Sequence, residues 1–61
     1  MTQEPEIPTE TLAESEDYMV WVSREPDGET VFHIDLGAVT LHFFQEEWEA
    51  FVRVIQQAAR A

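Results

Sequence analysis

The pattern of apolar residues predicts β-strands in two stretches near the middle of the chain. The first stretch, 18–24, reads YMVWVSR and is rich in the aromatic and β-branched residues that strands prefer. In the second, 30–36, apolar and polar residues alternate from Phe32 to Leu36. Between them lies Pro26-Asp27-Gly28, whose three residues suit successive positions of a tight turn. The pattern predicts a hairpin with a three-residue loop.

A second reversal is predicted at Gly37-Ala38, because glycine at the first position of a two-residue loop suits a type II′ turn. Each turn fixes a register: the first places Val20 opposite Ile34, and the second places Ile34 opposite Leu41. Both turns therefore collect the apolar residues on the same face of the sheet. One long strand with a glycine bulge is the alternative, and it explains the glycine but not the matched pairs. Three strands are favoured, at about 18–24, 30–36 and 39–44.

The last segment has helical periodicity and is predicted to form a helix over about 46–59. Four apolar residues recur at helical spacing and form one stripe: Trp48, Phe51, Val52 and Ile55. The stripe matches the apolar face of the sheet in width, so the helix is expected to pack there. The predicted fold is α+β: a three-stranded antiparallel β-meander with one C-terminal amphipathic helix on one face, forming a single small domain over 18–61.

Residues 1–17 differ in composition from the rest of the chain. They carry six acidic residues, no basic residue and two prolines. Such a segment buries too little apolar surface to offset the entropy of ordering, so a disordered acidic N-terminal arm is predicted. The arm serves either as a solubilising tail or as a contact for a basic partner, with Ile7 and Leu12 as anchors.

Charge and composition narrow the function classes. Thirteen acidic residues against three arginines give a formal net charge of −10, which disfavours direct nucleic-acid binding and attraction to an anionic membrane. The N-terminus lacks the features of a signal peptide, and no apolar run approaches the ~20 residues of a spanning helix. No cysteine is present. We expect a cytoplasmic protein without membrane contact.

One helix can cover only one face of the sheet, so the other face is predicted to stay bare. Large apolar groups on that face, bordered by acidic residues, are typical of an interface. The alternatives are ordinary exposure of scattered apolar residues and cover by the N-terminal arm. The residues predicted to bind a partner are Met19, Trp21, Val31, His33, His42 and Phe44.

The two histidines, His33 and His42, are predicted to lie directly opposite each other on that face. Cross-strand spacing suits two ligands of one Zn²⁺ or a coupled pH-sensitive pair. A structural zinc site needs four ligands and a catalytic one usually three, and Asp35 is the one nearby candidate for a third. His33, His42 and Asp35 therefore remain weak metal candidates, and we predict no metal and no cofactor.

Sequence motifs of catalysis do not occur: there is no Gly-rich phosphate loop, nucleophile elbow, HExxH or EF-hand loop. We predict a non-enzymatic protein. The leading hypothesis is a small acidic protein–protein interaction module or accessory subunit that docks through its uncovered sheet face or edge, on a protein partner or on itself as a homodimer. The alternative is an acidic inhibitor or nucleic-acid mimic that occupies a basic cleft. A metal- or pH-responsive regulator is the third class.

Overall fold

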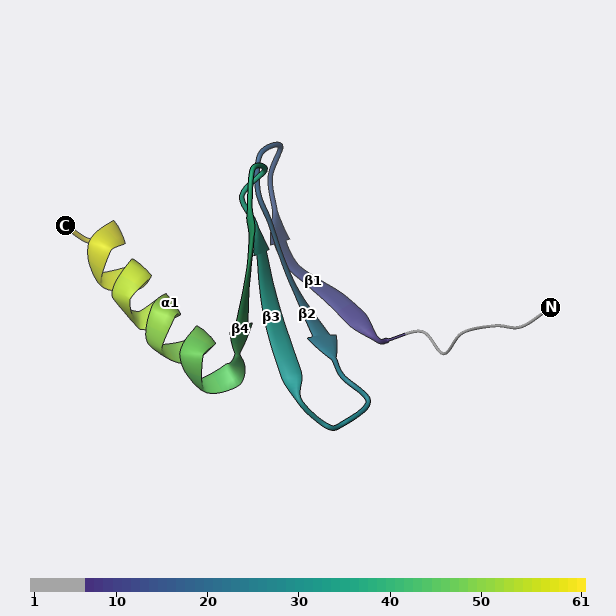
Figure 1. Cartoon of the computed structure of the whole chain (residues 1–61). Coiled ribbons are helices and arrows are strands. Elements are labelled where there is room, and N and C mark those ends of the chain that lie inside the picture. Colours follow the sequence, from purple (N-terminus) through teal and green to yellow (C-terminus); the bar gives the residue numbers. More distant parts are fainter. Residues whose placement is uncertain (1–6) are drawn as a thin grey trace.

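Residues 7–61 of the chain are described by a computed structural model (Figure 1). They form one antiparallel sheet in the order β1-β2-β3-β4, followed by a single helix. The α+β class and the C-terminal helix are confirmed, whereas the predicted number of strands is wrong by one. The elements are β1 Thr9–Glu14, β2 Met19–Arg24, β3 Thr30–Asp35, β4 Thr40–Phe44 and α1 Gln45–Ala59.

Both predicted strand registers are confirmed. Val20 pairs with Ile34 across β2 and β3, and Ile34 pairs with Leu41 across β3 and β4. The three-residue loop of the first hairpin is closed by the Glu25 N–H, which donates to the Glu29 carbonyl at 2.7 Å. These two registers decide which side chains share a face of the sheet.

Gly37 lies in a two-residue loop between β3 and β4, so the alternative of one long bulged strand is wrong. The Leu36 N–H donates to the Val39 carbonyl at 2.8 Å, and Gly37 has a φ of 90°. A positive φ is accessible to glycine because it has no Cβ. The strands are slightly shorter than predicted, since Leu36 and Val39 belong to the turn.

Strand β1 corrects the prediction that residues 1–17 form a disordered arm. Thr9–Glu14 pairs with β2, and the ladder is extended by the Arg24 N–H, which donates to the Pro8 carbonyl at 3.0 Å. Every residue of β1 is exposed, so backbone pairing holds the strand rather than burial of side chains. Residues 1–6 of the predicted arm lie outside the described residues.

The turn between β1 and β2 is organised by a serine. The Ser15 Oγ accepts hydrogen bonds from the N–H groups of Asp17 at 3.3 Å and Tyr18 at 3.2 Å, as in an ST turn.

A register shift between Thr11 and Ala13 marks a bulge in β1. Strand β1 thus covers the outer edge of β2, which would otherwise present unpaired backbone groups.

Helix α1 begins directly after β4, without a connecting loop. The Glu47 Oε1 accepts a hydrogen bond from the Phe44 N–H at 3.0 Å, which supplies a cap where the sequence has no Ser, Thr, Asp or Asn. Trp48 stacks on Phe32 with ring centroids 4.9 Å apart. The helix therefore lies on the face of the sheet that carries Phe32 and Phe43, as predicted; we call this the helix-side face.

The core is smaller than the apolar pattern suggested. Val22 and Ile34 are the buried apolar residues of the described chain, with 4% and 8% of their surface exposed, and α1 contains no buried residue. Figure 1 shows the reason: α1 leans away from the sheet toward its C-terminal end. The predicted registers place four further apolar residues on the helix-side face, but all of them are exposed: Tyr18, Leu36, Val39 and Leu41.

Substitution of Gly37 by L-alanine is expected to lower the free energy of unfolding by about 1–2 kcal/mol, because L residues disfavour a positive φ. No atom lies within 4 Å of a Cβ added at this position, so the cost comes from the backbone alone. D-Alanine, introduced by chemical synthesis, is the matched control, and it should match or exceed glycine in stability. Urea unfolding followed by circular dichroism measures both, and equal destabilisation by the two enantiomers would contradict the turn assignment.

Candidate functional site

The face of the sheet opposite α1 gathers all six residues predicted to bind a partner. Met19, Trp21, Val31 and His33 are half-buried, while His42 and Phe44 are exposed. The registers bring them together, since Trp21 pairs with His33, His33 with His42, and Val31 with Phe44. We call this surface the histidine face, and it consists of Met19, Trp21, Ser23, Val31, His33, His42 and Phe44.

Strand β1 extends the histidine face instead of covering it. Thr11 pairs with Trp21, and Thr9 pairs with Ser23, so both threonines stand beside the face at its outer edge. The alternative of cover by the N-terminal segment is thus wrong for the described part of that segment. The face remains open along the middle of the sheet.

A chain of hydrogen bonds crosses the histidine face. The Ser23 Oγ lies 2.7 Å from the His33 Nε2, and the His33 Nδ1 lies 2.7 Å from the His42 Nδ1. Trp21 stacks on the His33 ring with centroids 4.9 Å apart and planes 15° from parallel. Ring stacking and two hydrogen bonds fix the orientation of the central imidazole.

The bond between the two Nδ1 atoms limits how many protons the histidine pair can hold. One Nδ1 donates and the other accepts, so the pair keeps this bond with one proton added to its neutral state but not with two. Partial burial, and then the charge of His42, lower the pKa of His33, while Glu25 opposes them. His33 therefore favours the neutral form.

The contact of Ser23 with His33 has the distance of a nucleophile and its general base. Only 5% of the Ser23 surface is exposed, however, and Ser23 lines neither of the two recesses described below for residues 7–61. A substrate would lack access to the hydroxyl. The geometry fits a satisfied polar contact that holds the histidines in place, and the absence of catalysis stays a prediction.

The weak metal candidates are only partly brought together. His33 and His42 face each other through their Nδ1 atoms, but the Asp35 Oδ1 accepts a hydrogen bond from the Gly37 N–H at 2.8 Å and serves the turn. Over residues 7–61, no group of three or more histidine, cysteine or acidic side chains is arranged to hold a metal ion. Two imidazoles alone fall short of a structural or catalytic zinc site.

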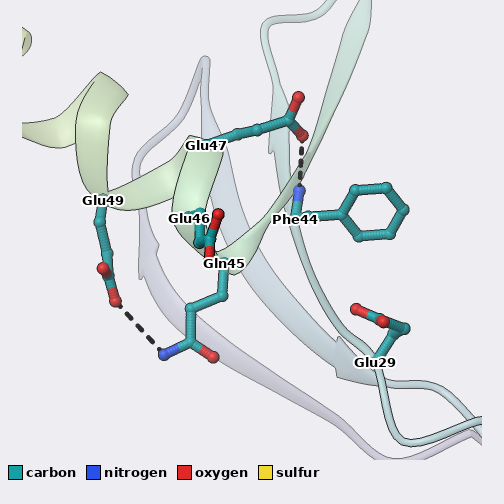
Figure 2. Close-up of a pocket in the computed structure, with 6 residues that line it drawn as sticks. All are labelled: Glu29, Phe44, Gln45, Glu46, Glu47 and Glu49. Atoms are coloured by element: carbon teal, nitrogen blue, oxygen red, sulfur yellow. Dashed lines mark hydrogen bonds between the residues drawn. The ribbon is translucent and has the colours of Figure 1, made fainter.

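An acidic recess borders the histidine face where β4 passes into α1. It has a volume of about 620 Å³, and Figure 2 shows Phe44 at its edge with Glu29 across from the helix. Its lining residues are Glu29, Phe44, Gln45, Glu46, Glu47 and Glu49. Four carboxylates beside an exposed aromatic ring favour a positively charged group of a partner.

Sequence reasoning missed this recess, although a signal for it was present. Glu29 comes two residues before Val31 and therefore shares its face, and the predicted register already placed Val31 opposite Phe44. The missing information was the direction in which α1 leaves β4, because that direction places the acidic first turn of the helix near Glu29.

Comparisons with protein-family models, curated proteins and solved structures found no match for this chain. Among the described residues, no helix combines the length and the apolar character needed to cross a membrane.

The lowered pKa of His33 is expected to make stability depend on pH near neutrality. Near this pH the folded protein binds fewer protons at His33 than the unfolded chain does. The contribution of His33 to the free energy of unfolding is therefore complete above its ordinary pKa of 6.5 and declines as the pH falls below that value. Urea unfolding between about pH 8 and pH 5, the range in which histidine titrates, measures this effect, and histidine NMR assigns the titration to His33. In His33→Gln the dependence should shrink. Titration of His33 above the ordinary histidine value would contradict the assignment.

Proposed function

We propose that this protein is a small non-catalytic interaction module that docks on a protein partner through the histidine face. The observation that carries the proposal is the open surface formed by Trp21, Val31 and Phe44 around the histidine pair, over which no element of the described chain lies. Aromatic residues and methionine are enriched in the cores of interfaces, and charged residues are depleted there. The central part of this face has that composition.

The fixed orientation of the histidine rings supports specific recognition of a partner, beyond the contact area that the face provides. Because Ser23 and Trp21 orient the His33 ring, its hydrogen bonds need little reordering when a partner binds. A pre-organised surface loses less entropy on binding than a mobile one. The Nδ1 contact with His42 leaves the remaining ring nitrogen of that exposed residue for a partner.

The acidic border indicates the kind of partner. Glu29 and the first turn of α1 form a rim of carboxylates at the Phe44 end of the face. The expected partner presents an apolar patch flanked by lysine or arginine, with the charges guiding orientation and association rate. A cytoplasmic location and the absence of direct nucleic-acid binding belong to the same proposal, and they are supported by the composition alone.

The alternative is an acidic inhibitor or nucleic-acid mimic that occupies a basic cleft. The acidic recess supports it, because four clustered carboxylates can imitate the charge of phosphates. Residues 7–61, however, carry eleven acidic residues against three arginines, and the resulting net charge of −8 lies at the upper end of the ordinary range for a small domain. An apolar centre with an acidic rim fits a protein interface better.

Affinity capture from the native cell extract tests the proposal. The W21A/F44A double variant should retain the partner at least about tenfold less than the wild type, as expected for the loss of two aromatic contacts at the centre of an interface. The Y18A/V39A variant removes two exposed apolar side chains outside the histidine face and is the control.

Salt separates the two candidate functions. Apolar docking should survive a change from low to high salt with a modest loss, whereas occupation of a basic cleft should collapse as the charges are screened. Capture of the same protein by the wild type and by W21A/F44A in equal amounts would reject the histidine face as the docking site.

A further inference from the structure

A second surface, on the opposite side of the sheet, has a different character. A groove of about 310 Å³ opens between α1 and the helix-side face, and none of the residues that line it is charged. Its lining residues are Val20, Ile34, Leu36, Leu41, Trp48, Phe51, Val52, Ile55 and Gln56. An apolar groove of this size on a small domain is unusual for a surface that stays in water.

The groove exists because only the first half of α1 reaches the sheet. Trp48 stacks on Phe32, and Phe51 stacks on Phe43, both with centroids 4.9 Å apart. Beyond these contacts the helix diverges (Figure 1), and Ile55 keeps 48% of its surface exposed. The sheet and the second half of α1 form the two walls.

The charges of α1 are divided along its length. Glu46, Glu47 and Glu49 lie in its first five positions, and after Glu49 the charged residues of the chain are Arg53 and Arg60 alone. Two such helices side by side and parallel would place like charges together. In an antiparallel pair, the acidic half of each helix lies beside the basic half of the other. The positive end of each helix dipole then lies beside the negative end of the other, which is also favourable.

We propose that the groove is filled by a second copy of this chain, with the two α1 helices packed antiparallel about a two-fold axis and Ile55 of each copy inserted into the groove of the other. A two-fold interface must be complementary to itself. This surface meets that condition in shape, because Ile55 in the wall of the groove keeps 48% of its surface exposed for a second groove. It meets the condition in charge because the acidic residues lie in the first five positions of α1, whereas Arg53 and the C-cap residue Arg60 follow them.

The dimer is distinct from the proposed function, since it uses the helix-side face and leaves the histidine face free. Each dimer would carry two histidine faces on its outer sides, one from each sheet. Such an arrangement gives bivalent binding to a partner with two sites, which raises the apparent affinity without any new contact.

Sedimentation equilibrium or light scattering from low to high micromolar concentration tests the dimer. The wild type should form dimers, and Ile55→Glu should be monomeric because it places a charge in the apolar groove. Val54→Glu adds the same charge at the adjacent, more exposed position outside the groove lining, and it should remain dimeric. A wild type that stays monomeric throughout, or an Ile55→Glu variant that dimerises as Val54→Glu does, overturns the proposal.

Charge reversal tests the antiparallel order and does not depend on the core. Arg53→Glu and Glu49→Arg should each raise the dissociation constant about tenfold or more. The doubly reversed E49R/R53E protein restores opposite charges across an antiparallel pair and should recover the wild-type constant. Failure of this recovery, with circular dichroism showing intact secondary structure, overturns the antiparallel arrangement.

The W21A/F44A variant distinguishes the two proposals. It should dimerise like the wild type while losing its captured partner, whereas Ile55→Glu should become monomeric. Dimerisation that is lost in W21A/F44A and kept in Ile55→Glu would locate self-association on the histidine face and reject the groove.

Discussion

Two hairpin turns determine which side chains share a face of the sheet, because they fix the registers of β2, β3 and β4. Gly28 and Gly37 both adopt a positive φ, with values of 92° and 90°, and each stands where a short loop reverses the chain. Side chains alternate between the faces of a strand, so a shift of one residue at either turn would exchange the two surfaces. The helix-side face and the histidine face are therefore consequences of loop geometry as much as of the strand sequences.

The sequence was sufficient to predict the pairing of β2, β3 and β4, but it was insufficient to predict strand β1 and the angle of helix α1. The registers of β2, β3 and β4 could be predicted because two turns and one apolar pattern agreed on a single arrangement. Strand β1 could not, since Thr9–Glu14 buries none of its side chains and is held by backbone pairing that no hydrophobic pattern records. The apolar stripe of α1 predicted which face the helix covers, but not the angle at which it leaves the sheet.

The same distinction applies to the candidate site. That Trp21, His33 and His42 share a face follows from pairing alone. Their contacts depend on side-chain rotamers: the bond of Ser23 to His33 and the ring stacking of Trp21 fix one imidazole, and Asp35 turns to the Gly37 N–H instead of the histidines. The strand pattern cannot specify such choices, because several rotamers are compatible with one backbone.

Stability and binding are connected in a domain with so small a core. Val22 and Ile34 are the buried apolar residues of the described chain, while nine large apolar side chains there keep more than a third of their surface exposed. Any partner that binds the folded state alone stabilises it by mass action. Binding at either face of the sheet then raises the population of folded chains that can bind a partner at the other face. Because the neutral form of His33 is the one that the fold favours, a lower pH would weaken the fold and both binding surfaces together.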